Sequence, residues 1–391
     1  MRLLRNSLIA LLALALIALV AFWAIAPGVV ERSKNTVGDG GPYPVSDAAA
    51  ALHATLTVGD LHADPLLWAR DLSIRGARGQ VDVPRLQEGN VALQVFTAVT
   101  KSPAGQNYDE NTAEALDNIT LLAFGQRWPI ATWTSLLARA QYQAEKLHRV
   151  EEDSNGRFKI IKTRADLDAV LEARANGENI TGGILGIEGA HPLEGDIANL
   201  DHIVASGYRL VALQHFFDNA LGGSLHGTSD QGLTEFGREV VREVVARDLV
   251  LDIAHSSHQV AEDVLAMTDI PLVVSHTGIQ AHCDVKRNYP DALMKRIAET
   301  GGVIGMGYWD EVTCGDSTPA GIATMIKTAI GVVGEDHVAL GSDFDGSVGT
   351  EFDTSELSSL THALIEVGLS ETQIRKVMGE NMVRVLRARL K

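Results

Sequence analysis

The chain has 391 residues, of which 46% are hydrophobic, and its net charge is −17. This length provides for a large core, and a single catalytic domain is the simplest organisation. The acidic charge and the lack of a lysine or arginine cluster exclude nucleic acid and an anionic membrane surface as electrostatic partners. The two cysteines, Cys283 and Cys314, are too few for a disulfide framework, and although they could form one bridge, we expect two free thiols.

Residues 1–26 predict a transmembrane helix. Arg2 and Arg5 precede an uncharged apolar run over residues 7–26, and about 20 such residues cross a hydrocarbon core of about 30 Å. Two alanines near the end of the run resemble a signal-peptidase site, but Pro27 would follow the cut and should fit a peptidase poorly. We therefore expect an uncleaved signal anchor with the catalytic domain on the periplasmic or extracellular side, in preference to a removed signal peptide.

Residues 27–52 are rich in glycine, proline and polar residues and are expected to form a linker, which leaves residues 53–391 for one domain. Short apolar runs alternate with helical patterns through this domain. Near-continuous hydrophobic strands of this kind are typical of a parallel sheet covered by helices, and eight of them predict an α/β fold, a (β/α)8 TIM-type barrel. The expected strands are residues 56–64, 91–99, 182–190, 208–216, 249–257, 271–278, 301–309 and 337–346.

About 80 residues separate the second and third expected strands, too many for one crossover helix, so a helical insertion is predicted there. Thr163 is a candidate N-cap for its last helix. Trp128 and Trp133 are expected to pack the insertion and not to bind a ligand. Helices are predicted over residues 111–128, 134–153, 163–177, 233–248, 257–268, 290–301, 320–334, 354–369 and 371–390.

Most of the expected strands end in a metal-binding or acid/base side chain. His62 and Asp64 are two residues apart on a strand, so both face the same side and could hold one metal ion, for which the mixed ligands favour zinc or a similar divalent ion. Glu188 ends a strand between glycines, where a buried carboxylate needs a cation, and it could bridge two ions. His255 and His276 end consecutive strands and could complete the second site. A lone buried histidine is usually a core residue, but this combination favours a metal centre.

Asp343 lies at the end of the eighth expected strand. A carboxylate there could orient or deprotonate the attacking water and then protonate the leaving nitrogen. Asp345 fits a turn residue equally well. His215 could be a metal ligand or could stabilise an oxyanion. Arg287 could bind a substrate carboxylate with two hydrogen bonds, or it could be a surface residue.

Several segments of the chain together resemble the membrane dipeptidase, or renal dipeptidase, family of zinc peptidases over residues 50–390. They are DLHADP, GIEGAHPL, LDIAHSS, SHTGIQAHCDVKRNYPD, GSDFDG and GENMVRVL, in the order and spacing of that family. The resemblance implies a barrel with two Zn²⁺ per chain that hydrolyses dipeptides, including some with a D-configured C-terminal residue.

The same resemblance implies a role for each candidate residue. His215 contacts the substrate at the reacting centre, and Arg287 binds its terminal carboxylate. Asp343 is the catalytic acid and base. The implied metal ligands are His62 and Asp64 for one zinc, Glu188 as the bridge, and His255 and His276 for the other zinc.

Two departures limit what the resemblance implies. The loop over residues 216–230 differs from the mammalian pattern, so the side-chain preference does not transfer, and the membrane signal is at the front of the chain instead of a C-terminal lipid anchor. His226 in this loop and His282 are expected near the mouth of the barrel.

A related metal-dependent amidohydrolase acting on a lactam or an acylated amino acid is the alternative function. A non-catalytic membrane-tethered binding protein is less favoured, because no ligand is missing; a homodimer remains open.

Overall fold

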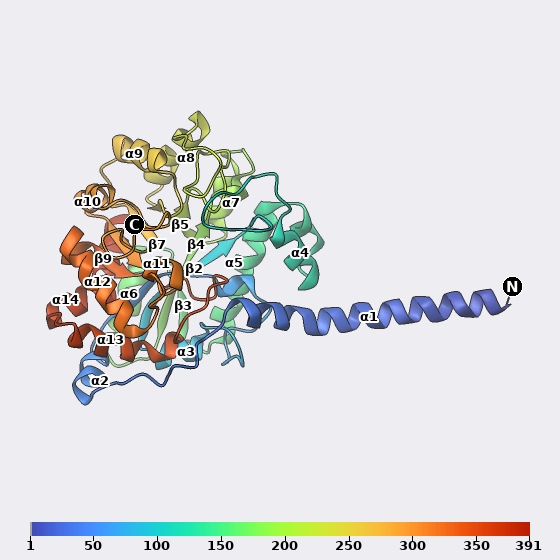
Figure 1. The fold of residues 1–391 in the computed structure, drawn as a ribbon, viewed down its shortest axis with the longest axis horizontal. Helices are drawn as coiled ribbons and strands as arrows, with labels where there is room; N and C mark the ends of the chain where they lie inside the picture. Colours follow the sequence, from blue (N-terminus) through green and yellow to red (C-terminus); the bar gives the residue numbers. More distant parts are fainter. Residues whose placement is uncertain (1) are drawn as a thin grey trace.

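The computed structural model describes residues 2–391 and contains a closed barrel of eight parallel strands surrounded by helices (Figure 1). β1 pairs with both β2 and β9, and β2 also pairs with β4, which closes the sheet. The predicted (β/α)8 barrel is thus confirmed. Its strands are β1 (Val58–Ala63), β2 (Val91–Val99), β4 (Thr181–Glu188), β5 (Tyr208–Ala212), β6 (Val250–Asp252), β7 (Val273–Thr277), β8 (Val303–Met306) and β9 (Val338–Leu340).

The helices between and after the strands lie close to their predicted places. The side chain of Thr163 accepts a hydrogen bond from the backbone of Asp166 and caps α6, as predicted. The helices of the domain are α2 (Asp47–His53), α3 (Val83–Glu88), α4 (Asn118–Gly125), α5 (Leu136–Asp153), α6 (Arg164–Ala175), α7 (Asn199–Ala205), α8 (Glu235–Ala246), α9 (His258–Met267), α10 (Asp291–Glu299), α11 (Asp310–Thr313), α12 (Pro319–Val333), α13 (Leu357–Glu366), α14 (Glu371–Arg375) and α15 (Asn381–Arg389).

The helical insertion between β2 and β4 is confirmed, with two differences. It contains a short strand, β3 (Phe158–Ile160), that pairs with the first residues of β4. α4 begins later than predicted because Asp117 caps it, accepting a hydrogen bond from the backbone of Ile119. Trp128 is buried in an apolar cluster and Trp133 packs against that cluster, so the prediction that both residues pack the insertion is confirmed.

The barrel strands end earlier than their apolar runs predict. His215, His255 and Asp343 each lie beyond the last residue of β5, β6 and β9, respectively. The backbone of His255 and Asp343 is left-handed, with φ values of 62° and 63°, which an extended strand does not contain. The carboxyl ends of the strands therefore continue into tight loops that carry these side chains.

The predicted C-terminal helix over residues 371–390 is interrupted between α14 and α15. Gly379 lies in the break, where an added Cβ would stand 1.9 Å from the carbonyl oxygen of Thr57. Only glycine allows so close an approach to the start of β1. α15 then closes the barrel at the end opposite the loops, and it packs with inward-facing strand residues in a cluster that includes Leu61, Val95, Ile184, Leu210, Val250, Met382 and Leu386.

α1 (Arg2–Lys34) extends from the domain as a single long helix (Figure 1). Among residues 2–391 it is the one helix long and apolar enough to cross a membrane, with a mean hydropathy of 3.0, as an anchor or a signal sequence would be. The expectation of an irregular linker from residue 27 was wrong for its first part, because the helix continues through Pro27. Beyond Pro27, Glu31 is buried in ion pairs with Arg70 and Arg78, which hold this end of α1 against the domain.

The expectation of two free thiols was wrong. Cys283 and Cys314 form a disulfide, with their Cα atoms 5.6 Å apart. Cys283 follows β7 and Cys314 ends α11 after β8, and these two strands are neighbours in the barrel. The pairing of β7 with β8 therefore brings together two loops that are 31 residues apart in the sequence, which the spacing alone does not reveal.

Breaking this disulfide should destabilise the domain, because a bridge of this loop length restricts the unfolded chain and contributes about 2–4 kcal/mol. We expect the double variant Cys283→Ser, Cys314→Ser to lose about this much free energy of unfolding in denaturant titrations. The wild-type protein, unfolded without a reductant, should not react with a thiol reagent. Reaction of two thiols per chain under those conditions would contradict the pairing.

Candidate active site

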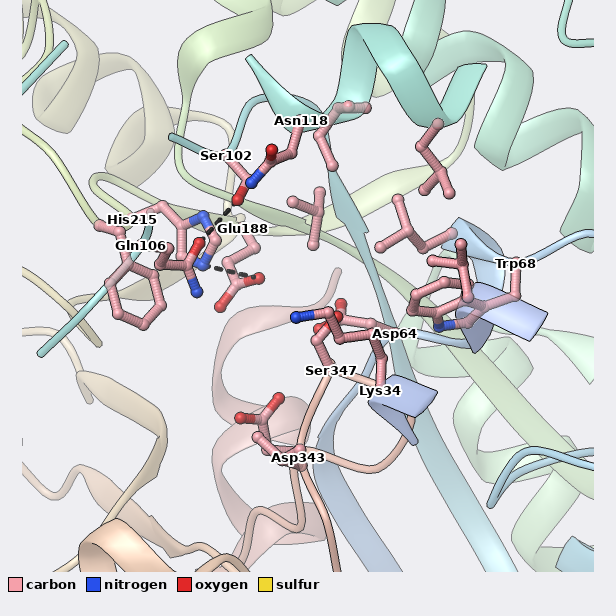
Figure 2. A pocket seen from close by; sticks show the side chains of 18 of the residues that line it. Lys34, Asp64, Trp68, Ser102, Gln106, Asn118, Glu188, His215, Asp343 and Ser347 are labelled. Atoms are coloured by element: carbon pink, nitrogen blue, oxygen red, sulfur yellow. Dashed lines mark hydrogen bonds and ion pairs between the residues drawn. The ribbon is translucent and has the colours of Figure 1, made fainter. Parts of the chain in front are cut away.

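A cavity of about 710 Å³ opens at the end of the barrel where the strands finish. The structure brings all eight predicted site residues together there, although they come from six different strand ends. Seven of them line the cavity, among them Asp64, Glu188, His215 and Asp343 (Figure 2). The eighth, His62, is fully buried and is not part of the lining. The seven are Asp64, Glu188, His215, His255, His276, Arg287 and Asp343.

Glu188 lies at the centre of this group. Its Oε1 is 3.3 Å from Nε2 of His255 and 3.4 Å from Nε2 of His276. The same oxygen is 3.5 Å from Nε2 of His62, and Oε2 is 3.4 Å from Nε2 of His215. One buried carboxylate thus faces four imidazole nitrogens, which is an arrangement suited to a carboxylate shared by two cations.

Overlapping sets of donor atoms could hold these cations. The donors of His62, Asp64 and Glu188 all lie within 4.8 Å of one another, as do those of Glu188, His215 and His255. On the other side, Nε2 of His255 and Nε2 of His276 are 2.9 Å apart. Nitrogen and carboxylate oxygen donors in sets of this kind fit zinc or a similar divalent metal.

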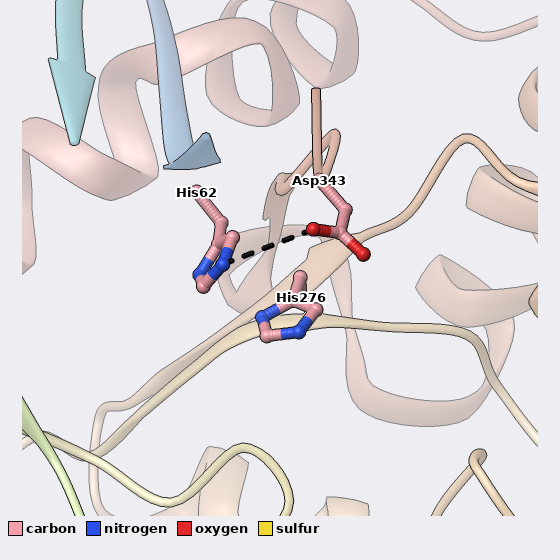
Figure 3. Close-up of side chains that lie close together, drawn as sticks. All are labelled: His62, His276 and Asp343. Carbon is pink, nitrogen blue, oxygen red and sulfur yellow. Dashed lines mark ion pairs between the residues drawn. The ribbon is translucent and has the colours of Figure 1, made fainter. Parts of the chain in front are cut away.

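Asp343 stands beside one of these sets. Its Oδ1 is 3.9 Å from Nε2 of His62, and the two residues form a third possible donor group with His276 (Figure 3). The left-handed backbone at Asp343 and at His255 is sparsely populated by non-glycine residues, and such conformations concentrate at functional sites. Here they turn each side chain into the cavity directly after a strand.

Ser275 supports two of the imidazoles from behind. Its Oγ lies 3.1 Å from Nδ1 of His62 and 3.0 Å from Nδ1 of His276. A hydrogen bond at Nδ1 fixes the orientation of a ring and leaves Nε2 to face Glu188. Asp252 accepts a hydrogen bond from the backbone of Ser275 and holds it in place. Our sequence analysis missed Ser275, although its position next to His276 at a strand end was an available signal.

Burial and mutual charge shift the pKa values of these groups. Burial raises the pKa of Glu188 well above its usual range, and the charge of Asp64 adds to this effect. Burial also raises the pKa of Asp343 to about 8. Burial opposes a charge on His62, but Glu188 and Asp64 outweigh it and raise its pKa to about 10. Burial lowers the pKa of His215 to about 4. Three carboxylates in one buried space favour a cation among them.

Arg287 is buried in the cavity wall without a carboxylate partner. One of its terminal nitrogens donates to the carbonyl oxygen of His276 at 2.6 Å, and its Nε has no hydrogen-bond partner among residues 2–391. The guanidinium group lies over the ring of Trp309. In contrast, Arg85 and Arg139 are buried and ion-paired with aspartates. The surface alternative for Arg287 is thereby excluded, and its unpaired charge suits an anionic ligand.

Three other residues that the sequence left open lie outside the cavity lining. Asp345 is buried and binds Arg70 and the backbone of Gln80, so that it fastens the first loop. His226 is buried behind the site, with Nδ1 2.8 Å from the carbonyl oxygen of Tyr108. His282, in the loop between β7 and α10, does not line the cavity.

The cavity lining includes residues that were not foreseen from the sequence, among them Tyr108 and Lys34. Tyr108 lies in the insertion, in a segment without a motif, and Lys34 is the last residue of α1. Lys34 lies near Asp64 in the cavity (Figure 2), because the C-terminal end of α1 packs against the domain. No local pattern in the sequence indicates that packing.

The model of the family described as membrane dipeptidase, peptidase family M19, matches residues 46–390. The chain belongs to this family. Dipeptidase tcpJ of Claviceps purpurea (strain 20.1) is 26% identical over 318 residues, which cover 79% of this chain and 69% of that protein. Membership of this family establishes the chain as a hydrolase of the dipeptidase class, in a family of metallopeptidases.

Solved structures share the fold of this membrane dipeptidase family member. The crystal structure of dipeptidase AC, a metallopeptidase of the same family, is 26% identical, has a TM-score of 0.71, and covers 86% of this chain and 99% of its own. A metallopeptidase from Rhodobacter sphaeroides, liganded with a phosphinate mimic of the dipeptide L-Ala-D-Ala, is 24% identical with a TM-score of 0.67. It covers 86% of this chain and 99% of its own.

Proposed function

We propose that this chain is a dinuclear zinc dipeptidase whose substrates include dipeptides with a D-configured C-terminal residue. The observation that carries the proposal is Glu188, whose two oxygens face imidazoles from several strands at 3.3–3.5 Å. In this assignment His62 and Asp64 would hold one zinc, His255 and His276 would hold the other, and Glu188 would serve both. Bound zinc would polarise the scissile carbonyl and lower the pKa of the attacking water.

The side chains around these ligands perform the remaining steps. Asp343, which lines the cavity beside His62, accepts a proton from the attacking water and delivers it to the leaving nitrogen. His215 faces Glu188 from the opposite side and is neutral at pH 7, so it can donate a hydrogen bond to the oxygen of the tetrahedral intermediate.

In the proposed function, Arg287 would select short substrates with a free C-terminus. Its buried, unpaired guanidinium group can bind the terminal carboxylate of a dipeptide through parallel hydrogen bonds. Binding the carboxylate near the metal centre places the first peptide bond of the substrate at the reacting position. The Rhodobacter sphaeroides protein binds a mimic of L-Ala-D-Ala, which makes that dipeptide a suitable first assay substrate.

We further propose that α1 is retained as a membrane anchor and holds the domain on the outer side of the membrane. Two features support retention. The apolar run is longer than an ordinary signal-peptide core of about 7–15 residues. The run also packs against the domain, since the rings of Phe22 and Trp23 lie tilted against the ring of Phe124, with centroids 6.4 and 6.0 Å away, respectively.

The metal assignment predicts about two zinc ions per chain after zinc reconstitution, measured by elemental analysis alongside hydrolysis of L-Ala-L-Ala and L-Ala-D-Ala. Glu188→Gln should weaken both sites together, because a single carboxylate serves both ions. Its zinc content after dialysis should fall from about two to well below one per chain. One metal or none in the wild-type protein would refute the dinuclear site. Loss of a single ion from the variant would show that Glu188 does not bridge.

Replacing Asp343 by Asn should leave zinc bound and lower kcat by about 10²–10⁴-fold, the usual effect of losing a general acid and base. Steady-state kinetics and zinc analysis of the same preparation test this. Asp345→Asn serves as a control for the loss of a buried carboxylate in the same loop, because Asp345 is also buried but pairs with Arg70 and does not line the cavity. If Asp343→Asn lost zinc in proportion to activity, Asp343 would be a ligand first.

Replacing Arg287 by Ala should mainly raise KM for dipeptides with a free C-terminus, by about 10-fold or more for a lost charge-assisted pair. Hydrolysis of the corresponding C-terminal amides should change far less, because these substrates lack the carboxylate. Kinetics with both substrate series on the wild type and the variant measure the difference. Equal losses for acids and amides would remove Arg287 as the carboxylate-binding residue.

A further inference from the structure

The exposed apolar side chains of the domain gather on one segment. Within residues 53–391 the exposed large hydrophobic side chains are Ile74 and four members of the segment 116–130. Globular surfaces normally scatter such side chains singly, so a group of this kind marks an interaction surface. We call the four the α4 surface: Leu116, Leu121, Phe124 and Ile130, which are 79%, 66%, 38% and 76% exposed, respectively.

This surface lies next to the helix that leads into the membrane. In Figure 1, α4 sits on the side of the domain from which α1 extends. Phe124 contacts Phe22 and Trp23 of α1, with ring centroids 6.4 and 6.0 Å apart. Both α1 residues belong to the apolar run of residues 7–26, so α4 reaches the level at which that run enters the bilayer.

The chemistry of the segment fits a lipid interface. Between residues 118 and 133 the single charged side chain is Arg127. Trp133 packs against Phe124 with ring centroids 5.4 Å apart, and tryptophan and phenylalanine are typical of the boundary between hydrocarbon and water. The net charge of −17 opposes electrostatic attraction to anionic lipid, so the contact must be apolar and local.

We propose that the α4 surface inserts into the interface of the same bilayer that α1 crosses. This inference rests on the proposed retention of α1. Ala26 and Pro27 of α1 line the active-site cavity together with Leu121 and Leu122 of the α4 region. The mouth of the cavity between the two helices is therefore held at the membrane surface, and the domain has a fixed orientation instead of swinging on its anchor.

The full-length chain in phosphatidylcholine nanodiscs tests this, with intact mass used to select protein that retains α1. An environment-sensitive fluorophore is attached at Ile130→Cys and, in a second variant, at Leu121→Cys. Because Cys283 and Cys314 form a disulfide, the introduced cysteine is the one thiol to label. Thr372→Cys is the matched control, since it is exposed on α14 at the far side of the domain from α1 (Figure 1).

We expect nanodiscs with doxyl-labelled lipid to quench the label at residue 130 or 121 about twofold or more, and to leave the label at residue 372 unchanged. Equal, weak quenching at all three positions would overturn the proposal. Shielding at residue 130 that grows with protein concentration but resists lipid quenching would also overturn it, because the occupant would then be a second copy of the chain. Cleavage of α1 in cells would refute the proposal that α1 is a retained anchor. It would not affect the nanodisc result, because that experiment uses chains that retain α1.

Discussion

Closure of the barrel between β1 and β9 is the constraint on which the site depends. Buried Asp60 of β1 accepts hydrogen bonds from the backbone and the hydroxyl group of Ser342, 282 residues away, at 2.9 and 2.5 Å. The backbone of Asp343 donates to the carbonyl oxygen of His62 at 3.2 Å. These bonds join the first and last strand ends, so His62 and Asp343 face one another across a cavity. In an open sheet they would lie at opposite edges.

The site concentrates charge that the fold otherwise excludes from its interior. Asp64, Glu188 and Asp343 share a buried space in which each carboxylate is costly, and burial raises the pKa of the last two. Arg287 lies in the same wall without an acidic partner within 4.0 Å among residues 2–391. In the proposed function, metal cations would compensate the clustered carboxylates and a substrate carboxylate would compensate Arg287. Ligands of opposite charge would therefore both stabilise the buried charges of the site and serve its proposed function.

The C-terminal end of α1 is packed into the domain. Its last turns are fixed by the ion pairs of Glu31 with Arg70 and Arg78, and Lys34 lines the active-site cavity. Arg70 also pairs with Asp345, which follows the catalytic candidate Asp343 in the loop after β9. A chain of buried contacts thus connects the end of α1 with the loop that carries Asp343.

The sequence by itself determined the barrel and the eight candidate residues that meet at its cavity. Continuous apolar runs indicate the barrel, because the strands of a parallel sheet are buried. The histidines and carboxylates that follow these runs indicate the site, because the carboxyl ends of the strands meet at one face of the barrel. Other features were decided by tertiary structure. The disulfide of Cys283 with Cys314, the place of Ser275 behind two imidazoles, and the fold of α1 against the domain each join segments that no local pattern relates. Contacts of this kind depend on which loops the closed barrel brings side by side, and that geometry exists only after the strands have paired.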